Sequence, residues 1–180
     1  PNSSNPLENP TPVSNAIETV ALVLIPMSIV FMAGFLLRRR RFAVMSLAVM
    51  GVMSVALIAA TVYSEVQPNA AFAGLSADGS NMEGKELRFG PELSALWGTF
   101  TTQTSNGSVN AMHDSFNPLG GLVTRAGMLI NAVWGGVGVG FINFIVYVWI
   151  AVFLSGLMIG PPRRFLAARS KPEKLPRWAR

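Results

Sequence analysis

The sequence has no cysteine, and its only histidine is His113. The absence of cysteine excludes disulfide bonds, thiol catalysis and metal sites built on thiolates. A single histidine leaves little scope for a histidine-based metal centre. Charged residues are also scarce, at 13% of the chain, which is about half the share of an ordinary soluble domain. These deficits argue against a soluble metalloenzyme.

Apolar residues make up 51% of the sequence, and the mean hydropathy is +0.43. Two segments, residues 16–37 and 42–63, are each 22 residues long, and Glu18 is the one charge that they contain. At 1.5 Å per residue each would reach roughly 33 Å as a helix, enough to cross a hydrocarbon core of about 30 Å. The sequence therefore predicts a membrane protein. We expect its first helix to start at an Asn15 N-cap that Glu18 completes as a capping box.

The formal net charge of +5 comes mainly from basic residues at two places. Residues 38–41 are four consecutive arginines, and the tail at residues 160–180 contains seven more lysines and arginines. Both groups follow an apolar segment, which is where basic residues mark the cytoplasmic side of a membrane. We expect the tail to be cytoplasmic and to contact anionic membrane lipid. No nucleic-acid partner is expected, because no basic stretch is interleaved with stacking aromatic residues.

The middle of the chain predicts a short helix that enters the membrane and returns. Residues 64–90 carry acidic side chains, glycine and asparagine, and they are expected to form an extracytoplasmic loop, as are residues 1–15. Residues 91–103 have apolar side chains at helical spacing, but their length of about 20 Å is too short to span. A full span here would place the basic tail outside, against the positive-inside rule. We therefore interpret residues 91–110 as a re-entrant pore helix and loop.

The last apolar region, residues 122–159, is 38 residues long and exceeds one straight span. Four glycines lie close together in it: Gly135, Gly136, Gly138 and Gly140. Glycine disfavours a helix interior, so this cluster predicts an interrupted transmembrane helix. A nucleotide-binding loop is excluded because no lysine follows the glycines. Close packing between helices remains an alternative reason for them.

Residues 101–110 are polar although apolar segments lie on both sides of them. Such a stretch lies at membrane depth only where protein or a water-filled path surrounds it. Backbone carbonyls and the negative end of a helix near Gln103 would suit a dehydrated cation. The candidate filter residues are Thr104, Ser105, Asn106, Gly107 and Ser108, and Gly107 permits a backbone conformation that other residues resist. An external turn stays open as the alternative.

Several long motifs of this sequence resemble those of one family. TTQTSNGSVNAMH at residues 101–113, MEGKELRFGPELSALW at 82–97 and LENPTPVS at 7–14 are similar to the KdpA family of the potassium-transporting ATPases. NPLGGL at residues 117–122 and the segment 134–140 extend the resemblance over essentially the whole chain. KdpA belongs to the superfamily of potassium transporters, in which four repeats of helix, pore loop and helix surround one pore.

The resemblance implies a place for this chain in a larger protein. Residues 16–37 look like the closing helix of the second repeat, and residues 42–159 look like the third repeat. We expect the first repeat, the second filter and the fourth repeat to lie outside this chain, which would be a fragment. The filter role passes by resemblance to residues 104–108, and the glycine cluster at 135–140 is implied to be an intramembrane gate.

The resemblance also implies a function and partners. The parent subunit would lie in the bacterial plasma (inner) membrane, bind extracytoplasmic potassium in its filter and pass it to the ATPase subunit KdpB. KdpC and KdpF would complete the complex. The chain itself would carry no catalytic residue and no organic cofactor, and K+ would be held by the filter backbone alone. The alternatives are part of a passive channel-like potassium transporter and a non-transporting membrane scaffold.

Three further polar residues near the filter allow two interpretations each. His113 is expected to be a structural hydrogen-bonding residue at the filter's outer edge rather than a ligand, since potassium prefers oxygen. Asp114 either caps a turn or adds negative potential. Arg125 either extends to the membrane interface or faces a polar interior.

Overall fold

The computed structural model describes residues 4–69 and 81–159. In these ranges the chain forms α1 (Pro12–Leu36), α2 (Arg40–Val66), α3 (Gly90–Gln103), the short 3-10 helix η2 (His113–Ser115), α4 (Pro118–Ile130) and α5 (Val139–Ile159). The β-pairing among these residues is limited to an isolated bridge between Lys85 and Ala111. The predicted all-α class is confirmed.

Three of the described helices are long and apolar enough to cross a membrane: α1, α2 and residues Val139–Met158 of α5. Large apolar side chains such as Leu24, Phe31 and Val52 are exposed on the outer faces of α1 and α2. Apolar surfaces of this extent do not stay in contact with water, so lipid or other protein has to cover them. The fold is therefore that of a membrane protein. The expectations for residues 1–3, 70–80 and the basic tail 160–180 lie outside the described residues.

The start of α1 differs from the prediction. Thr11 is the N-cap, and its capping box is closed by Ser14, whose main-chain nitrogen donates to the Thr11 hydroxyl at 3.2 Å. The predicted cap of Asn15 and Glu18 is therefore wrong. Pro12 at the first helical position favours the earlier start, because its fixed φ suits the helix and its missing N–H needs no partner there. Asn15 is buried and uses its side chain elsewhere.

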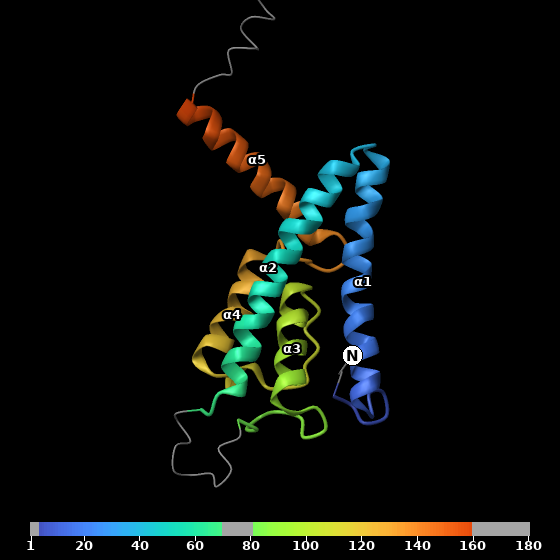
Figure 1. Cartoon of the computed structure of the whole chain (residues 1–180), viewed down its shortest axis with the longest axis vertical. Coiled ribbons are helices and arrows are strands. Elements are labelled where there is room, and N and C mark those ends of the chain that lie inside the picture. Colours follow the sequence, from blue (N-terminus) through green and yellow to red (C-terminus); the bar gives the residue numbers. More distant parts are fainter. Residues whose placement is uncertain (1–3, 70–80, 160–180) are drawn as a thin grey trace, which may run out of the picture. The chain divides into compact units, whose positions relative to one another are not determined.

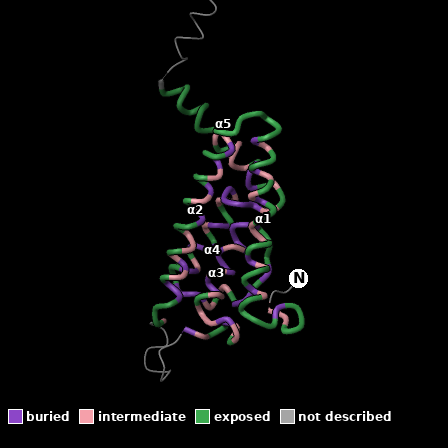
Figure 2. Tube along the Cα trace, turned by 45° about the vertical axis from the view of Figure 1, so that its right-hand side comes forward, coloured by how far each residue is buried: buried purple, intermediate pink, exposed green. Residues whose placement is uncertain are grey.

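By its contacts the chain divides into two units, Pro1–Phe144 and Ile145–Arg180. In the first unit α3 packs against α1, α2 and α4, and Figure 1 shows it between α1 on one side and α2 and α4 on the other. Figure 2 shows that burial is concentrated around this central helix. The described part of the second unit is the remainder of α5, which is mostly exposed.

The chain returns after α3 to the level at which α3 begins. Glu86 N donates to Asn110 O at 3.1 Å, and Met112 N donates to Gly84 O at 2.8 Å. These bonds join the segment before α3 to the segment that follows the polar loop. The helix and its loop therefore form one closed unit that enters and leaves the bundle at the same end.

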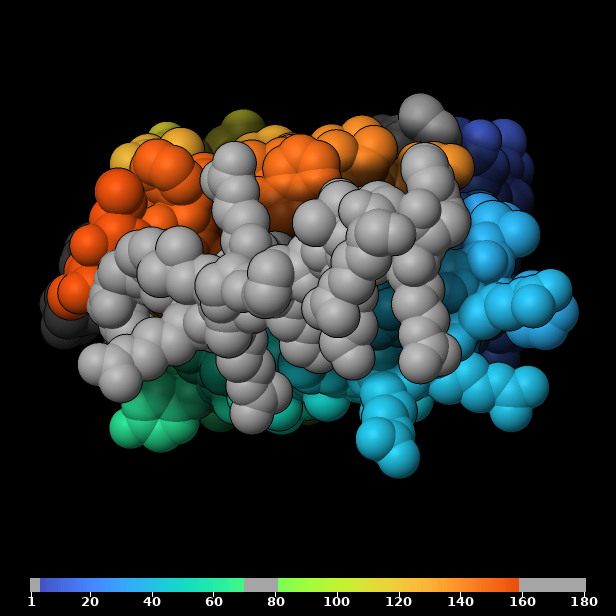
Figure 3. Space-filling model, turned by 90° about the horizontal axis from the view of Figure 1, so that it is seen from above, coloured from blue at the N-terminus to red at the C-terminus, as the bar shows by residue number. Residues whose placement is uncertain are grey.

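The last apolar region is interrupted, as the sequence predicts. α4 ends at Ile130 and α5 begins at Val139, and the four candidate gate glycines lie at or next to this break. α4 itself starts at Pro118, four residues before the predicted boundary, with proline again at the first helical position. The arginine turn at residues 38–41, between α1 and α2, is exposed. Figure 3 shows light-blue side chains extending from this part of the chain.

Candidate functional site

The loop after α3 begins with a tight reversal held by hydrogen bonds. Thr104 N donates to Phe100 O at 2.9 Å, and the Thr104 hydroxyl donates to the same oxygen at 2.8 Å. Asn106 N donates back to Thr101 O at 3.0 Å. Ser105 and Gly107 have positive φ angles of 55° and 85°. Glycine suits position 107 because it has no Cβ that would oppose a positive φ angle.

Exposure divides the five predicted filter residues into two sets. Thr104 and Ser108 are buried, whereas Ser105, Asn106 and Gly107 are exposed. Among the described residues, no hydrogen bond is donated to the main-chain oxygens of the three exposed residues. Main-chain oxygens of this kind are the groups that replace the water shell of potassium in selectivity filters. The exposed half of the loop is therefore the part that is suited to bind a cation.

The buried half of the loop holds this conformation in place. The indole of Trp97 donates through Nε1 to Ser108 O at 3.2 Å, and Ser108 N donates to Asn106 Oδ1 at 3.0 Å. Trp97 is only 3% exposed. The Ser108 oxygen thus accepts a hydrogen bond that fixes this part of the loop, and the role of Ser108 in the filter stays a prediction. Sequence reasoning treated Trp97 as a packing residue and missed this hydrogen bond.

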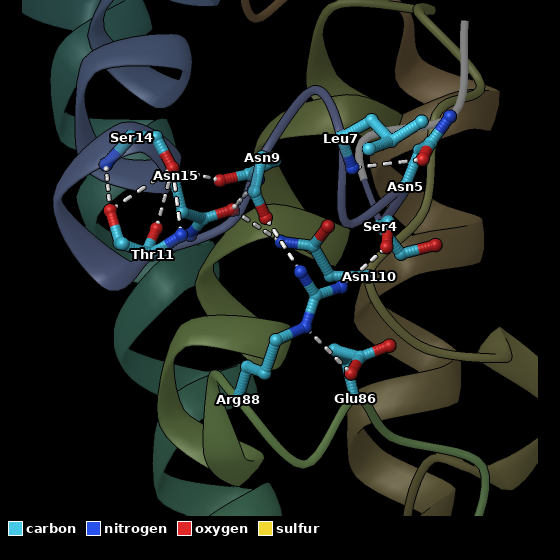
Figure 4. A network of polar contacts seen from close by, with 10 residues as sticks. All are labelled: Ser4, Asn5, Leu7, Asn9, Thr11, Ser14, Asn15, Glu86, Arg88 and Asn110. Carbon is cyan, nitrogen blue, oxygen red and sulfur yellow. Dashed lines mark hydrogen bonds and ion pairs between the residues drawn. The ribbon is translucent and has the colours of Figure 1, made fainter.

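Buried asparagines fix the end of the loop (Figure 4). Asn110 donates through Nδ2 to Asn15 Oδ1 at 2.6 Å, and Asn9 donates to the same oxygen at 3.0 Å. None of the three is more than 3% exposed. Because Asn15 lies in α1, this contact connects the loop to a different helix from the one that precedes it. Asn15 is an anchor for the loop instead of the predicted helix cap.

Arg88 extends the same network to the N-terminal segment. It donates to Asn9 O at 2.8 Å, to Ser4 O, and to Glu86 Oε1 at 3.0 Å (Figure 4). The hydrogen bond from Arg88 holds the pKa of the Glu86 carboxyl below its ordinary value. The segment before α1 is thereby tied to the base of α3.

The glycine-rich segment covers the C-terminal end of α3. Gln103 O accepts hydrogen bonds from Trp134 N at 3.3 Å and from Gly135 N at 2.6 Å. We expected the negative C-terminal end of α3 to face a cation. Its last carbonyl instead accepts these two main-chain hydrogen bonds. Gly135 has a φ of 56°, and a Cβ at this position would lie 2.2 Å from Gly140 N. The segment therefore reverses too tightly for a residue with a side chain.

A hollow of about 520 Å³ lies between the predicted filter loop, the glycine-rich segment and α1. Its walls include Ser105 and Asn106 from the loop, Asn131 and Gly136 from the glycine-rich segment, and Pro26 from α1. The Ser105 hydroxyl donates to Asn131 Oδ1 at 2.9 Å, which joins the two segments directly. The structure thus brings the predicted filter and the predicted gate together around one space.

Comparison with protein families gives a clear match. The model of the family described as potassium-transporting ATPase A subunit, KdpA, matches residues 1–174. The chain belongs to the KdpA family.

Individual KdpA relatives agree with this assignment. A protein of Geobacillus kaustophilus is 45% identical over 177 residues, which is 97% of this chain and 31% of the relative. A protein of Flavobacterium psychrophilum is 44% identical over 170 residues, 93% of this chain and 30% of the relative. A protein of Staphylococcus haemolyticus is 43% identical over 178 residues, 97% of this chain and 32% of the relative. Each is named a potassium-transporting ATPase potassium-binding subunit. The chain spans about a third of the length of these curated relatives.

On this KdpA segment, three polar residues that the sequence singled out separately share one pocket. His113, Asp114 and Arg125 line a space of about 470 Å³ together with Thr102 and Thr124. Burial lowers the pKa of His113 from its ordinary value of 6.5. His113 is therefore neutral at physiological pH, as suits a structural residue more than a charged one.

Sequence reasoning also missed a buried ion pair beside the pore loop. Lys85 Nζ lies 3.0 Å from Glu65 Oε2, and both side chains are completely buried. Glu65 was expected to lie in an extracytoplasmic loop, but α2 continues to Val66 and includes it. Lys85 pairs through its backbone with Ala111, where the loop returns. The available signal was Glu65, an acidic residue just after an apolar segment in a chain with few charges.

Proposed function

We propose that this KdpA segment supplies one filter loop of the potassium-binding subunit of an ATP-driven potassium uptake complex. The observation that carries the proposal is that residues 105–107 are exposed and that no described residue donates a hydrogen bond to their main-chain oxygens. Potassium would enter from the extracytoplasmic side and exchange water ligands for these oxygens. The other filter loops of the full-length subunit would supply the remaining ligands.

The surroundings of the loop support this role. Trp97, Asn106 and Thr104 hold its backbone through hydrogen bonds, so the oxygens are preorganised rather than collapsed onto one another. Below the loop, the glycine-rich segment at 135–140 would obstruct direct passage inward. The hollow beside α1 would offer the ion a lateral route from the filter to the ATPase subunit KdpB.

The proposed setting is a bacterial plasma membrane. The arginine turn at residues 38–41 would lie on the cytoplasmic side, and α3 would be re-entrant from the opposite side. KdpB would hydrolyse ATP, KdpC and KdpF would complete the complex, and this subunit would be non-catalytic. The family membership favours this setting over a passive channel-like transporter or a scaffold.

The test substitutes alanine for Gly107 in a full-length KdpA subunit that carries this segment. A Cβ at position 107 meets no atom within 4 Å, so the change acts through the backbone conformation at φ 85° and through the pore that the loop faces. Alanine in that conformation costs roughly 1–2 kcal/mol. We expect the potassium concentration that half-saturates ATPase activity to rise by about tenfold, the factor that corresponds to 1.4 kcal/mol.

Gly90→Ala is the matched control. Gly90 has a φ of 70°, and a Cβ there also meets nothing within 4 Å, so the backbone strain is similar, but the residue lies at the start of α3. We expect Gly90→Ala to leave half-saturation within about twofold of the parent. Equal effects of the two variants would overturn the filter assignment, as would an unchanged half-saturation in Gly107→Ala. Potassium flux without ATP hydrolysis in a purified complex that lacks KdpB would favour the passive alternative.

A further inference from the structure

The end of α3, the glycine-rich segment and the middle of α2 meet at one buried point. Gln103 Oε1 accepts a hydrogen bond from the Ser54 hydroxyl at 2.7 Å, and Ser54 Oγ accepts one from Trp134 Nε1 at 3.1 Å. The main chain closes the ring, because Gln103 O accepts from Trp134 N. Gln103, Ser54 and Trp134 are 0%, 3% and 5% exposed. The ring therefore forms inside the bundle and not on its surface.

The direction of each hydrogen bond in this ring is fixed by chemistry. An indole nitrogen only donates, so Ser54 must accept from Trp134. The single hydroxyl proton of Ser54 is then free to go to Gln103, whose side-chain oxygen only accepts. Removing the Ser54 hydroxyl leaves the Trp134 indole and the Gln103 side-chain oxygen without these partners, which is costly away from water. Both side-chain hydrogen bonds of the ring therefore depend on Ser54.

The ring is one of several contacts that hold the glycine-rich segment, of which residues 132–135 are buried. The glycine-rich stretch has positive φ angles at Gly135, Gly136 and Gly138, and the half-buried Asn131 that precedes it accepts a hydrogen bond from Ser105 in the loop. Gln103 Nε2 is buried and has no hydrogen-bond partner among the described residues. A ring with one unsatisfied donor holds the segment less firmly than a fully bonded one. This combination suits a contact that is released during function.

We propose that Gln103, Ser54 and Trp134 form a latch that holds the glycine-rich segment closed beneath the filter loop. The inference rests on the proposed function, in which this segment obstructs the pore and the loop binds potassium. All three are positioning residues, since none of them lines the hollow next to Ser105 and Asn106. Release of the latch would let the segment move without changing the loop that selects the ion.

Two substitutions in the full-length subunit, assembled with its ATPase, break the latch with little change in volume. Ser54→Ala removes both hydrogen bonds of the hydroxyl, and Trp134→Phe removes the indole donor. We expect each variant, reconstituted in liposomes, to raise passive potassium flux without ATP by about tenfold, and to keep potassium half-saturation of the ATPase within about twofold. A merely structural role would alter both quantities or neither.

Three control variants separate the latch from general damage. Ser54→Thr keeps the hydroxyl and should restore the low flux. Trp149→Phe changes an indole that is 71% exposed on α5, and it should leave flux and half-saturation unchanged. Trp97→Phe removes the hydrogen bond to Ser108 O, so it should raise half-saturation without raising passive flux.

The outcomes distinguish this inference from the proposed function. Parental flux in assembled Ser54→Ala and Trp134→Phe complexes would overturn the latch, even if Gly107→Ala shifts half-saturation as expected. Loss of assembly in both variants would also overturn it, because a latch is dispensable for folding. An unchanged half-saturation in Gly107→Ala would instead contradict the filter assignment itself.

Discussion

Glu65→Gln is expected to destabilise a full-length KdpA subunit severely. Glu65 accepts hydrogen bonds from Asn81 Nδ2 at 2.8 Å and from Asn117 N at 2.8 Å, in addition to its ion pair with Lys85. The glutamine amide would keep one of these acceptors but would place its own donor beside groups that also donate. Lys85 would be left as a buried cation without a counter-ion.

The magnitude follows from the burial of the pair. Removing one partner of a fully buried ion pair costs about 3–5 kcal/mol, because the remaining charge is stranded in a low dielectric. Lys85 Nζ also lies 5.5 Å from the centre of the Phe116 ring, but this contact is worth only about 0.5–2 kcal/mol and does not replace the carboxylate. The cost is also local to the pore loop, since Lys85 and Ala111 form the bridge at which the loop returns.

The assay compares melting temperatures of the purified complex, followed by tryptophan fluorescence. Glu65→Gln and Lys85→Met should each lower the melting temperature, and the double variant should recover most of the loss because it removes both charges. Glu86→Gln is the matched control, since Glu86 and Arg88 form a partly exposed pair that contributes about 0–1 kcal/mol. A double variant no more stable than the weaker single variant would refute the reasoning, as would equal effects of Glu65→Gln and Glu86→Gln.

Two further predictions concern acid stability and membrane topology. Because the folded-state pKa of His113 lies below 6.5, the unfolded chain binds its proton more readily. Stability should then fall as pH drops through about 6.5, and His113→Gln should reduce the difference in melting temperature between about pH 7.5 and about pH 5.5; an unaltered difference would contradict this. Single cysteines at exposed Arg39 and Glu83, in an otherwise cysteine-free subunit, should react with impermeant reagents from opposite sides of the membrane. Labelling of both from one side would contradict the assignment of α2 as a membrane-spanning helix.

The helical architecture was predictable because it depends on local properties. The length and apolarity of residues 16–37 and 42–63 are sufficient to indicate membrane-spanning helices, and four nearby glycines are sufficient to indicate a break after residue 130. The predicted helix boundaries were wrong where polar residues continue a helix. α2 extends past Ser64 and Glu65 because both side chains find partners near the start of α4, at Gly120 N and Asn117 N.

The supports of the candidate site were not predictable because their partners are distant in sequence. Asn15 and Asn110 are 95 residues apart, Ser54 and Trp134 are 80 apart, and Glu65 and Asn117 are 52 apart. A short window of sequence contains only one member of each pair. An isolated polar residue then resembles a cap, a loop or a surface position, although in an apolar chain it indicates a buried partner.

The hydroxyl groups of α3 show how a polar helix is packed at the centre of the bundle. The hydroxyls of Thr99 and Thr102 donate to main-chain oxygens of Ala95 and Gly98, four residues earlier, at 2.8 Å and 2.9 Å. Two threonines of α3 are thus paired within the helix itself, whereas the buried hydroxyl of Thr101 has no hydrogen-bond partner among the described residues. No described residue donates a hydrogen bond to the main-chain oxygens of residues 104–107, where the helix geometry ends and positive φ angles begin. In the proposed function, a cation that loses its water shell would find oxygen ligands at that boundary.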